Sequence, residues 1–139
     1  MNIKPPQTGK IVAGLAASAL ALWLQPAQAA LINKADNASA LNAGASWAGG
    51  TAPGVNDTAV WTSSVLVNTN DDPLGAALSW SGIQIANPGG PITIPADGNT
   101  LTLGIGGINM YTASQGLTLS NNVAVSAPQY WQVGNGQTL

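Results

Sequence analysis

The sequence predicts an all-β protein whose strands wind into a right-handed parallel β-helix, a three-sided solenoid. Three observations favour this fold: short apolar–polar–apolar triplets fill the second half of the chain, turn residues separate them, and equivalent triplets recur at a nearly constant interval. An antiparallel β-sandwich is the alternative, because strands spaced by about 8 to 12 residues also fit that fold. Sandwich strands usually run about 5 to 6 residues, however, and these triplets are shorter.

The first element of the chain, residues 1–29, is a predicted signal peptide. Lys4 and Lys10 precede an apolar run over residues 11–24. That run is shorter than the roughly 20 residues that span a bilayer, and its flanks follow the order of a secretory signal. The segment therefore predicts export through the Sec pathway, with no stable transmembrane segment in the mature chain.

Cleavage is expected between Ala29 and Ala30. Ala27 and Ala29 are small residues at the two positions that a signal peptidase reads, and Ala30 follows them. The mature chain, residues 30–139, is long enough for one small domain. It contains no cysteine, so its stability must come from apolar burial and backbone pairing rather than from disulfides.

Charged residues are scarce, and this scarcity excludes several classes of function. The chain has three Lys or Arg, five Asp or Glu and no His. Binding to nucleic-acid phosphates needs a basic face, which this composition cannot supply. General bases, thiol nucleophiles and metal clusters draw mainly on His, Cys, Glu and Lys. We therefore expect a non-enzymatic protein with no catalytic residues, no cofactor and no metal site.

Seven triplets from residue 83 onward alternate with a period of two, which places both end residues of each on one face of a strand. Segments rich in Gly, Pro, Asn and Ser separate them and supply turn residues, and no helix is predicted after the signal peptide. The triplets are residues 83–85, 92–94, 101–103, 108–110, 117–119, 123–125 and 131–133.

Equivalent triplets recur at a period in the low twenties. Ile83 and Ile108 are 25 residues apart, and Leu101 and Val123 are 22 apart. Three short strands in such a period match one coil of a three-sided solenoid, so each triplet should pair with the triplet one coil earlier. Extended backwards, the same period aligns Leu78 with Leu101 and places Val60 one coil before Ile83.

These spacings divide the mature chain into two parts. Residues 30–82 are expected to form an N-terminal cap and the first strands, and residues 83–139 the coils of the β-helix. Trp47 and Trp61 bracket a turn rich in Gly, Pro and Asn that lacks the lysine of a phosphate-binding loop. We expect these two indoles to cover the open end of the first coil.

The same segment resembles a known family. From residue 47 the pattern Trp-x-Gly-Gly-x-x-Pro-x-x-x-Asp-x-Ala-Val-Trp, followed by residues 82–85 and 107–110, looks like the N-terminal region of bacterial proteins with autotransporter-associated β-strand repeats. Residues 131–139 are similar to the stretch that leads into those repeats. The resemblance implies an exported passenger with a structural or adhesive role, at the cell surface or outside the cell of a Gram-negative-type bacterium.

The sequence also differs from the pattern of this family. The many glycine- and threonine-rich repeats of long passengers are missing, and the sequence ends within a strand-like stretch, so we expect a truncated β-helix that is incomplete at its C-terminus. An uncovered last coil would favour end-to-end self-association. The partner of its lateral surface is expected to be an unidentified surface ligand or a polysaccharide.

Two other functions are alternatives to this scaffold. A secreted carbohydrate-binding module would stack sugar rings on exposed aromatics, for which Trp80, Tyr111 and Tyr130 are the candidates; Trp131, by contrast, has the inward parity of Val133. A fragment of a β-helical polysaccharide-degrading enzyme is disfavoured, because such enzymes need basic residues or paired acids.

One oxygen-rich segment suggests a cation. Residues 68–72, with their Asn, Thr and Asp side chains, contain the kind of ligand that calcium prefers. Their spacing does not match an EF-hand, and a proline follows them, so a solvated turn is favoured over a calcium site.

Overall fold

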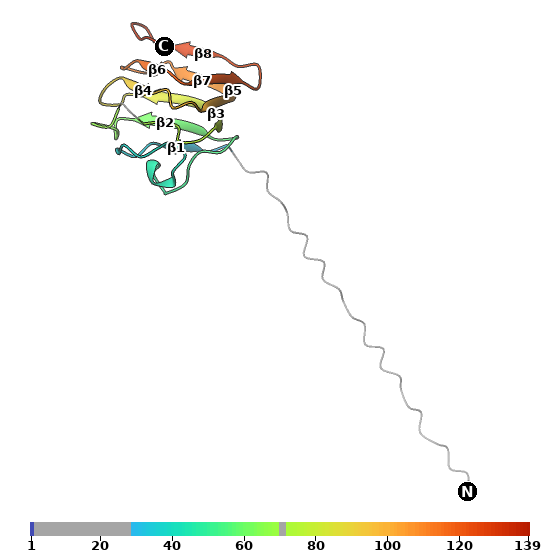
Figure 1. The fold of residues 1–139 in the computed structure, drawn as a ribbon. Helices are drawn as coiled ribbons and strands as arrows, with labels where there is room; N and C mark the ends of the chain where they lie inside the picture. The colour runs from blue at the N-terminus through green and yellow to red at the C-terminus, as the bar shows by residue number, and fades with distance from the viewer. Residues whose placement is uncertain (2–28, 70–71) are drawn as a thin grey trace.

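The computed structural model describes Met1, residues 29–69 and residues 72–139 (Figure 1). In the described part, parallel strands stack as a β-solenoid of about four turns, with almost no helix. The predicted signal peptide falls largely on residues 2–28, which lie outside the described residues, and so does Ala27.

Two sheets carry the solenoid. One has the strand order β1-β2-β3-β5-β7 with β8 also paired to β5, and the other joins β4 to β6. Every one of these strand pairs is parallel, which excludes the antiparallel sandwich. The elements are β1 (Leu31–Asn33), the 3-10 turn η1 (Gly44–Ser46), β2 (Thr58–Thr62), β3 (Leu78–Ala86), β4 (Ile92–Ile94), β5 (Thr100–Met110), β6 (Leu117–Leu119), β7 (Asn122–Val125) and β8 (Trp131–Val133).

The strand register confirms the predicted coil period. Leu101 pairs in parallel with Leu78 in the preceding turn and with Val123 in the following turn. Ile83 likewise pairs with Ile108. Such evenly spaced parallel pairing between successive coils is the defining feature of a solenoid, in which each repeat contacts only its neighbours.

One register differs from the prediction by a single residue. The sequence period places Val60 beside Ile83, whereas Ile83 pairs with Ala59. The observed register sets Trp61 beside Ile85, and both of these large side chains lie in the core. Packing of the large side chains thus determines the alignment here, because a shift of one residue would turn them to the other face.

Two strands pass around a corner of the solenoid without a break. Residues 101–103 and 108–110, predicted as separate triplets, both belong to β5, and residues 104–107, predicted as a turn, continue that strand. A register shift between Trp80 and Gly82 marks the same corner in β3. Bulges bend a strand in this way, so the corner is made by irregular pairing rather than by a loop.

Inward side chains stack in columns that form one core. The buried aliphatic residues of the middle turns include Leu101, Leu103, Ile108 and Met110, each at most 1% exposed. Burial of each such side chain is worth about 1.5 to 3 kcal/mol relative to exposure. Apolar stacking between turns, together with backbone pairing, therefore holds the cysteine-free fold.

The last described turn leaves its inward residues half covered. Trp131 pairs with Ile108 in the ladder, as its parity predicts, but it is 47% exposed, and Val125 is 57% exposed. The expectation that Trp131 lies in the core is therefore wrong, because no described residue stacks on the far side of β8.

Candidate functional site

Three indoles form the core beneath the N-terminal segment. Trp47 packs edge-on against Trp61 and Trp80, with ring centroids 5.7 Å away in both cases. The Trp47 Nε1 donates a hydrogen bond of 2.8 Å to the carbonyl of Leu41 inside the core. Edge-to-face contacts of this kind add stability beyond the buried area. The indoles of Trp47 and Trp61 therefore have a structural role.

Trp80 is not a ligand-contact residue. Its side chain is 0% exposed, so it cannot stack on a sugar ring at the surface. In β3 it pairs with Leu103, whose side chain is also wholly buried. The prediction that Trp80 contacts a ligand is wrong because its strand parity turns the indole inward.

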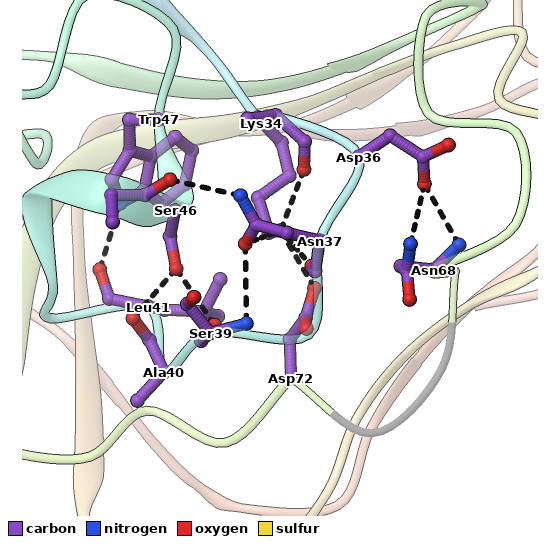
Figure 2. A network of polar contacts seen from close by, with 12 residues as sticks. Lys34, Asp36, Asn37, Ser39, Ala40, Leu41, Ser46, Trp47, Asn68 and Asp72 are labelled. Carbon is purple, nitrogen blue, oxygen red and sulfur yellow. Dashed lines mark hydrogen bonds and ion pairs between the residues drawn. The ribbon is translucent and has the colours of Figure 1, made fainter.

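A buried ion pair between Lys34 and Asp72 joins the residue after β1 to the segment before β3 (Figure 2). The Nζ atom of Lys34 lies 3.1 Å from Asp72 Oδ2, and the side chains are 0% and 5% exposed. Lys34 also donates to the carbonyls of Ala35 and Asn37, at 2.8 and 2.7 Å. A buried charge is tolerated only when it is paired and hydrogen-bonded, and Lys34 meets both conditions.

Side chains beside Lys34 hold the loop that leads to η1. Asn37 Oδ1 accepts from the backbone N of Ser39 at 3.1 Å, and its Nδ2 donates to the carbonyl of Ala45 at 2.9 Å. The hydroxyl of the buried Ser46 is 2.7 Å from the carbonyls of both Ser39 and Ala40. These contacts, drawn in part in Figure 2, fix residues 35–46 as a folded cap rather than a free loop.

Sequence reasoning missed this network. The signal that could have found it is that Lys34 is the only basic residue after the predicted cleavage point. A lone lysine among aspartates favours an ion pair, but the sequence does not say which aspartate lies beside it.

Asp36 and Asp97 use their carboxylates to bind backbone groups of other loops. Asp36 Oδ1 accepts from the backbone N of Asn68 at 2.9 Å and from its Nδ2 at 3.0 Å. These bonds, the backbone one first, lower the pKa of Asp36 to about 2. Asp97 Oδ2 accepts from the backbone N of Gly75 at 2.7 Å, and hydrogen bonds from Asn99 and then Gly75 lower its pKa. Both carboxylates are stabilised in the charged form.

The oxygen-rich segment 68–72 is engaged with protein partners at the positions that the structure describes. Asn68 contacts Asp36, and Asp72 contacts Lys34. Residues 70–71 lie outside the described part. Across the described ranges, no group of three or more His, Cys, Asp or Glu side chains could hold a metal ion.

An open groove of about 440 Å³ follows one side of the solenoid. Successive turns contribute Asn56, Ser81, Gly104 and Ser126 to its lining, and Ala29 lies at the same site. Its walls carry no charged side chain. The groove can therefore offer hydroxyl and amide groups to a ligand, but no acid or base.

The two predicted tyrosines are exposed but lie apart. Tyr111 and Tyr130 are 74% and 85% exposed. Ile108 pairs with Trp131 and Met110 with Val133, so Tyr130 precedes this ladder and Tyr111 follows it. The structure therefore leaves both rings accessible, at opposite ends of one ladder rather than on a common platform.

Comparisons of the chain with protein-family models, with curated proteins and with solved structures found no match. The geometry of the described residues thus carries the functional argument. Among those residues, no helix has the length and apolar character needed to cross a bilayer.

Proposed function

We propose that this chain is an exported, non-enzymatic β-helical surface protein that acts as a structural or adhesive scaffold, similar to an autotransporter passenger. Export is inferred from the order of charged, apolar and small residues in the first 30 positions. The resemblance of residues 47–61 to the passenger family supports a place at the surface of a Gram-negative-type bacterium or outside the cell.

The observation that carries the proposal is that the charged side chains bind other groups of the same chain. Lys34 and Asp72 pair with each other, and Asp36 and Asp97 accept backbone hydrogen bonds from neighbouring loops. Asp57 accepts backbone hydrogen bonds from Gly54 in its own turn and from Ala30. Each charged side chain of the described residues is thus bound within the scaffold. General acid–base catalysis works best when the pKa of the group lies near the working pH, whereas these hydrogen bonds lower the pKa of Asp36 and of Asp97, so this arrangement favours a structural role over an enzymatic one.

Uncharged polar side chains repeat on the outside of the turns. Gln84 pairs with Asn109, and Asn109 pairs with Gln132, so three amides lie in one outward column. On another side Thr93 pairs with Thr118. A repeated array of amides and hydroxyls offers many weak, equivalent contacts along a stiff rod, which suits adhesion through multiple contacts.

Cells that display the full chain provide the test. We expect their attachment to abiotic and polysaccharide-coated surfaces to exceed that of cells without it. Replacing Gln84, Asn109 and Gln132 by Ala should reduce the gain, because the outward amide column is lost. The matched control replaces Thr93 and Thr118 by Ala, which keeps that column. Equal attachment with and without the chain would contradict the adhesive role.

Sugar binding at exposed tyrosine is the second candidate, and the high exposure of Tyr130 favours it. Aromatic rings commonly supply large, rigid contact area in binding sites. Co-sedimentation with insoluble polysaccharide should be lost in Tyr130→Ala and kept in Tyr111→Ala if Tyr130 carries the contact. No sedimentation of the natural protein with any polysaccharide would dismiss this candidate.

A further inference from the structure

The turn before β2 holds the carboxylate of Asp57 against the start of the first strand. Asp57 Oδ1 accepts a hydrogen bond of 3.0 Å from the backbone N of Ala30. The next residue, Thr58, donates its backbone N–H to the carbonyl of Ala30 at 2.8 Å. Both backbone groups of Ala30 are therefore bound by consecutive residues, Asp57 at the end of the turn and Thr58 at the start of β2, and the position of its nitrogen is fixed.

Asp57 is itself held by contacts that do not involve Ala30. Its Oδ2 accepts from the backbone N of Gly54 at 2.9 Å, and its own N–H donates to the Gly54 carbonyl at 3.0 Å. Its carbonyl accepts from the backbone N of Ser81, in β3, at 2.8 Å. The carboxylate is thus oriented toward Ala30 by the turn and by the next coil.

Ala30 is also the residue that would become the first of the mature chain. Hydrolysis of the Ala29–Ala30 peptide bond consumes one water, leaves a carboxylate on Ala29 and leaves an amine on Ala30. That amine is mostly protonated at neutral pH, because an α-amino group has a pKa of about 7.7 to 8.0. The Ala30 nitrogen, which cleavage would convert into the α-amine, is therefore the atom that the Asp57 carboxylate already binds.

We propose that signal-peptide removal converts the hydrogen bond between Ala30 and Asp57 into an ion pair that locks β1 onto the second coil. This inference rests on the proposed export of the chain. In the uncleaved chain the Ala30 nitrogen offers one neutral N–H, whereas after cleavage it offers a charged group with three donors. The acceptor is a carboxylate in both forms, so cleavage adds the attraction between two opposite charges to an existing hydrogen bond, and this attraction stabilises the first turn of the solenoid.

Few cations compete with the Ala30 amine for the carboxylate of Asp57. The only other cation in residues 30–139 is Lys34, whose ammonium is bound to Asp72 and to two carbonyls. Asp57 and Ala30 are partly exposed, so solvent weakens the pair. We expect the ion pair to change the unfolding equilibrium constant by about two- to fivefold, the range found for solvent-accessible pairs.

The test begins with the full chain produced in a Gram-negative host. N-terminal sequencing of the exported protein should read from Ala30. The α-amine is then acetylated. The only other amine of the processed chain belongs to Lys34, which is buried and serves as an internal control for selectivity. Urea unfolding should show that acetylation raises the unfolding equilibrium constant about two- to fivefold.

Two variants locate the effect. In Asp57→Asn acetylation should leave stability unchanged, because the charged acceptor is gone. In Asp97→Asn, which removes another carboxylate that binds backbone N–H groups, the effect of acetylation should persist. An equal effect of acetylation in the natural protein and in Asp57→Asn would overturn the ion pair, and so would an exported chain that starts at another residue.

A reactivity measurement covers the case in which Asp57→Asn does not fold. The α-amine of the natural processed protein should acetylate more slowly when folded than in urea, and equal rates would overturn the proposal. Failure of export would count against the proposed function instead. The same comparison on the full chain cleaved by signal peptidase in vitro would then still decide the ion pair.

Discussion

The Lys34 ammonium lies 3.1 Å from Asp72 Oδ2, and neither side chain is more than 5% exposed. Lys34 follows β1 directly, whereas Asp72 belongs to the segment that leads to β3. The pair therefore ties the first strand of the solenoid to the approach of the third. Since the same ammonium binds the carbonyls of Ala35 and Asn37, it also holds the loop between them.

Removing one member of this pair should destabilise the protein strongly. Asp72→Asn leaves a buried ammonium with no counter-ion, and we expect a loss of about 3 kcal/mol in the free energy of unfolding, measured with urea. Replacing both residues, Lys34→Met with Asp72→Leu, should lose less than Asp72→Asn alone, because no charge is then buried. A loss below about 1 kcal/mol for Asp72→Asn would show that solvent reaches the pair.

Asp36 should contribute acid-sensitive stability. Its pKa is about 2 in the folded chain, below the 3.8 that describes it without these contacts. A depressed folded pKa means that the stabilisation is complete above the unfolded value and is lost as the pH falls through the folded value. As the pH falls from 3.8 to about 2, the Asp36→Asn variant should therefore lose less free energy of unfolding than the natural protein loses.

The direct measurement is an NMR titration of the Asp36 carboxyl carbon in the folded protein. We expect a midpoint near 2. A midpoint at 3.8 would mean that the hydrogen bonds from Asn68 do not persist in solution.

Substitutions at two glycines with positive φ distinguish the cost of a left-handed backbone conformation from the cost of a steric clash. Gly107, at φ 58°, has the carbonyl oxygen of Tyr130 where a Cβ atom would lie, whereas Gly98, at φ 82°, has nothing within 4 Å of that position. Gly98→Ala should cost about 1 kcal/mol from the left-handed conformation alone. Gly107→Ala should cost about 1 to 3 kcal/mol more, because it also forces β5 and β8 apart. Equal losses in thermal unfolding would contradict the close approach of these strands.

Trp47 should be essential to the core, unlike Trp131. Trp47→Ala empties a buried indole site and should cost about 3 to 5 kcal/mol. Trp131→Ala removes a side chain that is 47% exposed and should cost clearly less. Urea unfolding followed by circular dichroism measures both losses. A smaller loss for Trp47→Ala than for Trp131→Ala would argue against the indole cluster under the cap.

The sequence predicts the ladders well because the coil period depends on countable spacings. Leu101 and Val123 face inward at a fixed interval, and backbone pairing follows from that interval. The corners are harder to predict. Residues 104–107 have the composition of a turn, but pairing with the neighbouring coil keeps them in one strand. A tertiary partner overrides local preference there.

The candidate site was predictable only in part. Parity along the strand predicts that Tyr130 faces outward, and it is exposed. The same parity rule turns Trp80 inward, because it lies two residues after Leu78 on one strand, and the expectation of ligand contact disregarded this parity. The contacts of Lys34 with Asp72 and of Ala30 with Asp57 join segments distant in sequence, so no local pattern reveals them.

The central claim is that the chain is an exported solenoid in which one face of each strand is exposed to solvent and the other is packed in the core. Single-cysteine labelling tests this claim most directly. The natural chain has no cysteine. Thr118 is exposed on β6, and Leu103 is 0% exposed in β5. Intact cells and medium are treated with a bulky maleimide that does not cross the outer membrane. We expect Thr118→Cys to be labelled and Leu103→Cys to react only after denaturation; labelling of Thr118→Cys only after cell lysis would contradict the account.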